Sequence, residues 1–210
     1  MSEAIMILCA HSDDEAAGMG GTIYKYLEEG KKIIKIVFSF GQQSHPHILD
    51  NITTKTRVKE TKRISNTLGI ESYFFGLSDT KLEEEIRKRK IKEKLKTLIK
   101  KYNPKKIFVT SDQDIHPDHR AVSIVTQKAV DELGLNIELY SFEVWNLINE
   151  NKPAIYIDIT HYYSKKVKLM KEFKSQKHFM YPLLLPIYFR SRKYGKKIKT
   201  KYAEKFYKIK

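Results

Sequence analysis

The chain has 210 residues, of which 41% are hydrophobic, and a formal net charge of +15; this composition predicts one globular domain with a full core and excludes a disordered chain. Its single cysteine excludes a disulfide framework and a thiolate metal site, and no apolar run reaches the roughly 18 residues that a membrane span requires. The first residues lack the basic start of a signal peptide, so we expect a protein of the reducing cytoplasm.

Strand and helix patterns alternate along the first 160 residues. The apolar, β-branched and aromatic runs predict strands at 4–10, 32–40, 72–75, 106–110, 137–145 and 154–159. Periodic polar and apolar residues, several followed by glycine, predict helices at 22–29, 55–68, 82–102, 119–133 and 165–173. Residues 41–53 read as a polar loop that carries His45 and His47. This alternation predicts an α/β fold with a mostly parallel central sheet flanked by helices.

The last fifty residues are strongly basic. Residues 161–210 contain 16 lysines and arginines against Glu172 and Glu204, whereas residues 1–160 are nearly neutral. The excess predicts an anionic partner: a phosphate- or lipid-linked substrate, or the surface of an anionic membrane. A solvated lysine-rich face, or a tail that packs across the sheet, would explain it equally well. We assign 1–178 to one catalytic domain and 179–210 to a basic, aromatic extension of that domain. The sequence is also compatible with a homo-oligomer.

Two polar clusters follow predicted strands. The segment HSDDE (11–15) follows the first strand, and SDQDIHPDHR (111–120) follows the fourth. If those strands are neighbours in a parallel sheet, both clusters open onto one crevice at the carboxyl ends of the strands.

The adjacent carboxylates of the first cluster point to a cation. Asp13, Asp14 and Glu15 repel one another unless a positive charge offsets them. His11 and Asp14 are three residues apart and suit one ion, for which HPDH (116–119) can supply a third ligand. Zinc fits these ligand types, as does ferrous iron. An acidic surface loop with unrelated histidines is the plainer alternative.

A dinucleotide-binding loop is excluded at the same place. Gly18 and Gly20 provide a GxG, but Ile23 occupies the third glycine position. Three carboxylates also stand where a pyrophosphate would need backbone N–H groups and no negative charge. We expect these glycines to let the following helix lie close to the sheet.

The clusters together carry a family resemblance. AHSDDE (10–15) followed by GGT (20–22) resembles the (A)HPDDE…GGT signature of the PIG-L/LmbE-like zinc N-deacetylases, and HPDHR (116–120) resembles their second signature. Weaker similarity covers RVKE (57–60), FGLSD (75–79), EVWN (143–146), KSQ (174–176) and YAEKF (202–206). The resemblance implies a Rossmann-like, three-layer α/β enzyme that removes acetyl groups from N-acetylglucosamine-type sugars.

The resemblance also implies roles at the metal. His11, Asp14 and His119 would be the zinc ligands, Asp13 the general base, and His116 would polarise the acyl oxygen. These roles agree with general chemistry, since zinc makes hydroxide available near neutral pH, Asp13 is next to a ligand, and a protonated histidine stabilises an oxyanion.

The remaining assignments concern Asp118, two proposed substrate contacts and one position that differs from the family signature. Asp118 could keep His116 protonated by charge pairing. Arg57 would contact the substrate, or form a surface pair with Glu60, and Asp79 would bind sugar hydroxyls, or cap a turn. Ser12 stands where the family has proline, which relaxes the loop without removing a ligand.

Two apolar side chains near the strand ends are expected in the core. Cys9 should be a small buried residue. Trp145 could stack on a sugar, although a core position is the safer interpretation.

The leading functional hypothesis is a metal-dependent N-deacetylase of amino sugars. Other hypotheses are an amidase for another N-acyl sugar or thiol-sugar conjugate, a basic nucleic-acid-binding protein without catalysis, and an inactive carbohydrate-binding protein. We expect no nucleic-acid partner, because that reading leaves both histidine clusters unexplained.

Overall fold

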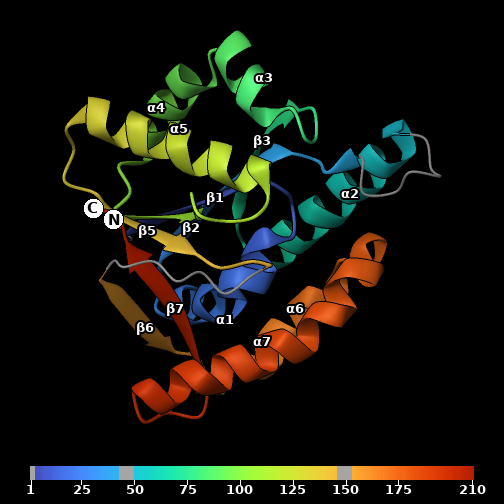
Figure 1. Ribbon diagram of the computed structural model, residues 1–210, viewed down its shortest axis with the longest axis vertical. Helices are drawn as coiled ribbons and strands as arrows, with labels where there is room; N and C mark the ends of the chain where they lie inside the picture. Colours follow the sequence, from blue (N-terminus) through green and yellow to red (C-terminus); the bar gives the residue numbers. More distant parts are fainter. Residues whose placement is uncertain (1–2, 43–49, 146–152) are drawn as a thin grey trace.

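The computed structural model describes residues 3–42, 50–145 and 153–210, which form a sheet between two layers of helices (Figure 1). The strands run in the order β3-β2-β1-β4-β5-β7-β6. Their bounds are Ala4–Cys9 (β1), Lys32–Ser39 (β2), Glu71–Leu77 (β3), Lys106–Thr110 (β4), Glu138–Phe142 (β5), Ala154–Asp158 (β6) and Ala203–Lys208 (β7). The helices are Asp14–Glu28 (α1), Asp50–Leu68 (α2), Leu82–Lys88 (α3), Ile91–Tyr102 (α4), Pro117–Leu133 (α5), Tyr163–Glu172 (α6) and Lys177–Lys197 (α7).

The predicted fold class is confirmed. Strands β3, β2, β1, β4 and β5 are parallel, and only β7 runs against its neighbours β5 and β6. The chain proceeds outward from β1 to β3 and then returns to place β4 on the other side of β1. The strand order therefore reverses between β1 and β4, and ligands of open α/β sheets bind at this reversal.

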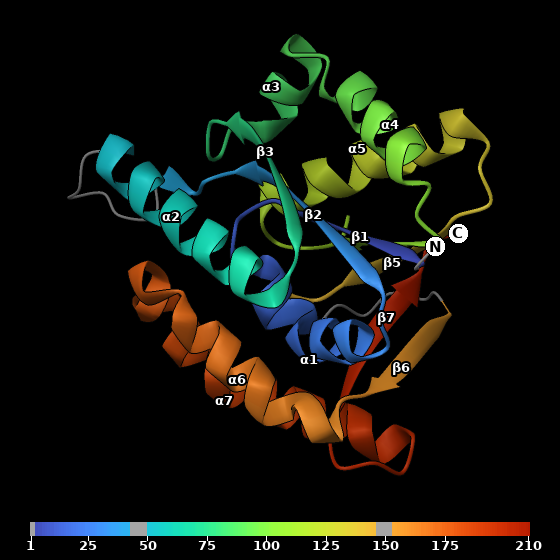
Figure 2. The ribbon, with the colours of Figure 1, turned by 180° about the vertical axis from the view of Figure 1, so that it is seen from behind.

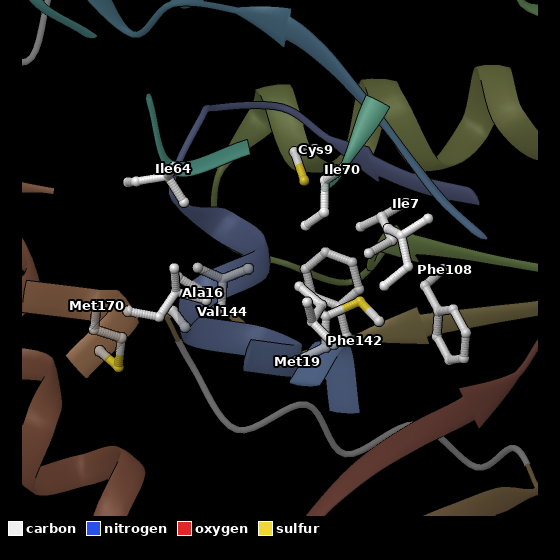
Figure 3. Close-up of a cluster of buried hydrophobic side chains, with 14 of the residues drawn as sticks. Ile7, Cys9, Ala16, Met19, Ile64, Ile70, Phe108, Phe142, Val144 and Met170 are labelled. Atoms are coloured by element: carbon white, nitrogen blue, oxygen red, sulfur yellow. The ribbon is translucent and has the colours of Figure 1, made fainter. Parts of the chain in front are cut away.

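Both faces of the sheet are covered, as the apolar run of β1 predicted. Ile5, Ile7 and Cys9 pack towards α1, α2, α6 and α7, while the alternate residues Met6 and Leu8 pack towards α3, α4 and α5. Figure 2 shows the two helical layers from behind, and Figure 3 shows the first of these cores, with Ile7, Cys9 and Phe108 labelled. A strand buried on both sides positions the loop that follows it.

Three helices differ from their predicted extents. Helix α2 begins at Asp50, inside the predicted polar loop 41–53, rather than at residue 55. The single helix predicted over 82–102 is wrong, because Lys90 adopts the left-handed conformation (φ 50°) and separates α3 from α4. Helix α1 begins at Asp14 rather than at residue 22, and it is kinked at Met19. A Cβ on Gly18 would lie 2.3 Å from the Phe142 ring, so this glycine allows α1 to approach the sheet as expected.

The C-terminal segment is built into the sheet. Residues 177–197 form α7, and β7 lies between β5 and β6. Glu204 of β7 accepts hydrogen bonds from the backbone N–H groups of Gly21 (3.1 Å) and Thr22 (2.7 Å), which the kink in α1 leaves without helical partners. The buried ammonium of Lys166 donates to the same carboxylate at 2.5 Å. Across the described ranges, no helix has both the length and the apolar character needed to cross a membrane.

Candidate metal centre and active site

The two polar clusters meet at the strand reversal. Because β1 and β4 are adjacent parallel strands, the loop that leads from β1 into α1 lies beside the loop that leads from β4 into α5. The convergence expected from the sequence is therefore present.

Three side chains from these loops form a candidate metal site. One ligand atom from each of His11, Asp14 and His119 lies within 4.8 Å of the other two, and all three residues are buried. Asp14 Oδ1 is 3.3 Å from His119 Nε2 and 3.9 Å from His11 Nδ1. The other oxygen of Asp14 accepts the His11 backbone N–H at 2.8 Å, which orients the carboxylate. A second cluster, His11, His116 and Asp118, overlaps the first at His11.

The surroundings of His119 suit a metal ligand. Its ring is fully buried, and neither nitrogen makes a hydrogen bond with satisfactory geometry within the described part of the chain. Its Nδ1 lies 3.1 Å from a carboxylate oxygen of Asp114, which is 2% exposed. Metal-bound histidines commonly direct their second nitrogen at a carboxylate in this way. Both nitrogens of this buried ring thus face carboxylates without a well-aligned hydrogen bond, and a bound cation would satisfy them.

Electrostatics also favour a cation here. Burial opposes a charged imidazole, but hydrogen bonds that His11 donates to the Asp118 and Asp79 carboxylates raise its pKa to about 10. Asp14 and Asp114 likewise outweigh burial and raise the pKa of His119 to about 9. Burial would raise the pKa of Asp14, yet the His119 and His11 charges hold it well below its usual value. Without metal the imidazoles therefore retain protons that neutralise the carboxylates, and a divalent cation would displace these protons.

Asp13 lies beside this set and is held by an arginine. The Arg57 Nη2 group donates to Asp13 Oδ1 at 3.1 Å and to the Ser12 hydroxyl at 3.2 Å, and Nη1 donates to the Gly41 carbonyl at 3.1 Å. Gly41 has φ +65°, and a Cβ there would fall 2.4 Å from Arg57 Nη1. The surface pair of Arg57 with Glu60 is not formed, since Arg57 is 3% exposed and turned to the site.

Glu60 instead fastens α2 to the segment before α7. It accepts hydrogen bonds from the backbone N–H of Ser175 at 2.9 Å and from its hydroxyl at 2.5 Å. This contact holds the next residue, Gln176, where it lines the site.

A buried lysine supports the loop between β1 and α1. Lys35 of β2 donates to the Ser12 carbonyl at 2.6 Å and to Glu15 Oε1. Both side chains are almost completely buried. Burial raises the pKa of Glu15, and the Lys35 charge opposes that rise. Cys9, buried as predicted, lies 3.6 Å from the other oxygen of Glu15.

His116 caps α5 and faces the cavity. Its Nδ1 accepts the backbone N–H of Asp118 at 3.2 Å, so a neutral ring carries its hydrogen on Nε2. The negative charge of Asp118 raises the pKa of His116, which is the expected direction, but this carboxylate makes its contacts with other groups. It accepts the Thr80 N–H at 2.8 Å and lies 3.3 Å from His11 Nε2. Burial and the His11 and His119 charges outweigh the Asp118 charge and lower the pKa of His116.

A cavity of about 300 Å³ opens over these groups. It is lined by His11, Asp13, Asp14, Gly41, Arg57, Asp79, Thr80, His116, Trp145, Gln176 and Phe179. Asp79 Oδ1 lies 2.9 Å from His11 Nε2, so its carboxylate faces the site. Trp145 is 36% exposed and packs edge-to-face on Phe179 at a centroid distance of 6.0 Å. The expected core position of Trp145 is therefore wrong, because the side chain lies at the rim.

Sequence reasoning missed several residues of this site. Asp114 lies in the polar segment SDQDIHPDHR (111–120), five residues before the metal-ligand candidate His119, and this position was an available signal. Gln176 lay in the weakly similar KSQ stretch, which was an available signal. Lys35 and Phe179 gave none, because a lysine in a strand and a residue near a tail are usually on the surface. The loop that holds His45 and His47 lies outside the described residues.

Known proteins are similar to most of this chain. Residues 6–130 match the family model described as PIG-L, GlcNAc-PI de-N-acetylase. A diacetylchitobiose deacetylase of Thermococcus kodakarensis is 25% identical over 188 residues, which cover 81% of this chain and 69% of that protein. A probable N-acetyl-α-D-glucosaminyl L-malate deacetylase 2 of Bacillus cereus is 27% identical over 140 residues, 63% of each chain.

A solved structure shows the same fold over the whole chain. The N,N′-diacetylchitobiose deacetylase of Pyrococcus horikoshii superposes with a TM-score of 0.82 and 22% identity, covering 99% of this chain and 84% of that one.

Proposed function

Because this chain belongs to the PIG-L family of de-N-acetylases, we propose that it is a zinc-dependent N-deacetylase that releases acetate from an N-acetylated amino sugar. The observation that carries the proposal is the convergence of His11, Asp14 and His119 beside Asp13 at the floor of one cavity. The names of two relatives describe deacetylases of N-acetylglucosamine-type sugars. These names support the proposed substrate class.

The residues fit a metal. Two imidazoles and one carboxylate form a common catalytic donor set, and the unsatisfied nitrogens of His119 supply a reason for the cation. When bound, zinc supplies Lewis acidity, which polarises an acyl oxygen and lowers the pKa of water towards about 7. Ferrous iron suits the same donors.

Asp13 is proposed as the general base. It lines the cavity next to the Asp14 ligand, and Arg57 fixes one of its oxygens. It takes a proton from the attacking water and passes that proton to the departing amine, so that amide and water become acetate and free amine.

His116 is proposed to stabilise the oxyanion. Because its Nδ1 accepts a backbone N–H, its Nε2–H is available to donate to the acyl oxygen as negative charge develops there. This role needs no protonated ring. Asp118 contributes by holding His11 and the Thr80 backbone, which shapes the same wall of the cavity.

The remaining cavity residues are proposed to bind the sugar. Arg57 and Asp79 present charged groups suited to hydroxyls, and the exposed Trp145 ring offers a face on which a sugar can stack. The free, buried Cys9 supports a reducing, cytoplasmic location as part of the same proposal.

Asp13→Asn tests the base. We expect acetate release from N,N′-diacetylchitobiose to fall by about 10²- to 10⁴-fold, with zinc content unchanged because the three ligands remain. Asp131→Asn, on an exposed position of α5, is the matched control and should retain the full rate. A wild-type rate in Asp13→Asn would show that the base is another residue.

A substrate panel separates the remaining hypotheses. N-acetylglucosamine conjugates should be cleaved in preference to N-acyl amino acids and simple amides. Preference for a thiol-sugar conjugate would favour the second amidase hypothesis. Zinc-loaded protein that binds N-acetyl sugars without releasing acetate would support a carbohydrate-binding protein instead.

A further inference from the structure

Helix α7 exposes an apolar surface. Nine large apolar side chains are exposed among the described residues, and five of them belong to α7. They are Phe179, Tyr181, Leu185, Tyr188 and Phe189. Leu185 and Phe189 are 62% and 61% exposed, whereas single surface side chains of this size are usually scattered. The opposite face of the helix is buried in the core through Met180, Leu183 and Ile187.

The apolar side chains continue into a basic row. Tyr181, Leu185, Phe189, Lys193 and Lys197 are spaced four residues apart, so each lies about one turn after the last, and all five are exposed. The outer face is therefore apolar in its first half and basic in its second. We call this row, together with the exposed Phe179, Tyr188 and Lys196, the α7 face.

The buried carboxylate of Glu143 lies 3.8 Å from Arg190, and the other cations of α7 form no ion pair within the described residues. Helix α7 contains no acidic residue. The two glutamates of the C-terminal fifty residues are engaged elsewhere, since Glu172 pairs with Arg63 at 2.8 Å and Glu204 is buried. The α7 face therefore presents only positive charge around its apolar side chains.

The α7 face is continuous with the active site. Phe179 and Trp145 line the catalytic cavity, and Trp145 also lines a neighbouring hollow of about 270 Å³ together with Pro186, Phe189 and Lys193. A further hollow of about 520 Å³ follows along the helix between Tyr188, Phe189 and four basic side chains. The path from the cavity thus leads over apolar groups to a cluster of cations.

We propose that the α7 face binds an anionic lipid surface and holds the mouth of the catalytic cavity against it. Turnover of a membrane-embedded substrate rests on the proposed deacetylase function, and the docking does not. Helix α7 lies at the outside of the molecule in both views (Figures 1 and 2). Aromatic and aliphatic side chains bordered by lysine and arginine are typical of helices that lie in the interface of anionic membranes.

Charge argues for lipid over the other occupants. A second copy of the chain would bring an equally basic face against this one in a two-fold contact. Nucleic acid would satisfy the cations, but it would leave Leu185 and Phe189 without an apolar partner. An anionic bilayer offers phosphates to the basic half and hydrocarbon to the apolar half.

Vesicle co-sedimentation of the full chain tests the docking. The probes are phosphatidylcholine vesicles with and without phosphatidylglycerol, at low and high salt. We expect binding to the anionic vesicles only. The binding should weaken by about tenfold or more in Leu185→Ser/Phe189→Ser and in Lys193→Glu/Lys196→Glu. Deleting residues 190–210 would remove β7 from the sheet, so point substitutions at exposed positions are the informative changes.

Matched controls lie in the opposite helical layer. Ile124→Ser on α5 removes an exposed apolar side chain, and Lys94→Glu/Lys100→Glu on α4 reverses two exposed charges; both should bind as the wild type does. Equal loss in the controls, binding to neutral vesicles, or unchanged binding in the α7 variants would overturn the proposal. So would a dimer in light scattering that the α7 substitutions dissociate.

Activity separates this inference from the proposed function. All α7 variants should cleave soluble N,N′-diacetylchitobiose at the wild-type rate, because none of the substituted residues lines the catalytic cavity. They should lose turnover of an N-acetylglucosaminyl lipid embedded in anionic vesicles. If neither substrate is cleaved but vesicle binding follows the expected pattern, the deacetylase function fails and the docking stands.

Discussion

The guanidinium of Arg57 reaches the hydroxyl of Ser12, with Nη2 and Nε at 3.2 Å and 3.4 Å from Oγ, while it also holds Asp13. The family signature has proline where Ser12 stands, and proline restricts the backbone directly. In this chain a side-chain contact replaces that restriction. The loop that carries the proposed base is therefore positioned from outside, by α2.

Ser12→Ala should lower kcat/KM by roughly three- to tenfold, because the two hydrogen bonds from Arg57 to the Ser12 hydroxyl are lost while Arg57 keeps its contacts to Asp13 and Gly41. Steady-state acetate release measures this change, and zinc content should stay the same. Ser123→Ala removes a comparably buried hydroxyl from α5 and serves as the control. An unaltered kcat/KM in Ser12→Ala would show that the Ser12 hydroxyl is not required to position Arg57.

Lys35→Met should destabilise the fold by about 3–5 kcal/mol, because it leaves the carboxylate of Glu15 buried without its cation. Urea unfolding measures the loss. Lys32→Met, on the exposed start of the same strand, should cost far less. Glu15→Gln in the Lys35→Met background should restore part of the stability, since the uncompensated charge is gone.

The same variant should show a defined pH dependence. Burial already raises the pKa of Glu15 in the folded state above its ordinary value of 4.5, and removing Lys35 raises it further. A folded-state pKa above the unfolded value favours folding at low pH, and that benefit is lost as the pH rises through the folded-state pKa. The deficit of Lys35→Met should therefore be smaller at about pH 5 than at about pH 8. A deficit that grows on acidification would contradict the assignment of Glu15.

The sheet and the meeting of the two loops were predictable because they depend on repeated local patterns. The apolar run of β1 shows its burial on both faces, and His11 and His119 follow strands whose ends must share an edge in a parallel sheet. The buried partners of the site were not predictable in this way. Lys35 and Glu204 are polar residues in strands, and their burial depends on partners distant in the sequence. Lys35 pairs with Glu15, 20 residues away, and the partners of Glu204 lie 38 to 183 residues away.

Helix boundaries failed for a related reason. The charged stretch 82–102 has good helical periodicity throughout, and its composition does not indicate that Lys90 adopts the left-handed conformation. In α1, Gly18 lies against the Phe142 ring, and Glu204 accepts the backbone N–H of Gly21 just after the kink. Such features arise from tertiary contacts, which the local pattern does not contain.

Cys9 should be unreactive in the folded protein. Burial raises the pKa of its thiol well above 9, and the neighbouring Glu15 charge adds to the rise, so the reactive thiolate is scarce at neutral pH. An aromatic disulfide reagent should modify no thiol under native conditions and one after unfolding in guanidinium. Lys35→Met should accelerate the native reaction by opening the same region. Rapid, complete modification of the wild type would show that the end of β1 is accessible.

Asp114 should set the metal affinity of the site without binding the metal. Its Oδ2 lies 3.1 Å from His119 Nδ1, and its Oδ1 accepts the backbone N–H of His116 at 2.9 Å. Asp114→Asn preserves an oxygen for the His116 contact but removes the charge that orients and polarises His119. We expect zinc affinity to fall by about 10- to 100-fold, measured by competition with a chromogenic chelator. Asp112→Asn, two residues earlier and hydrogen-bonded to Gln127, should leave the affinity unchanged. Equal affinities in wild type and Asp114→Asn would show that His119 is oriented by packing alone.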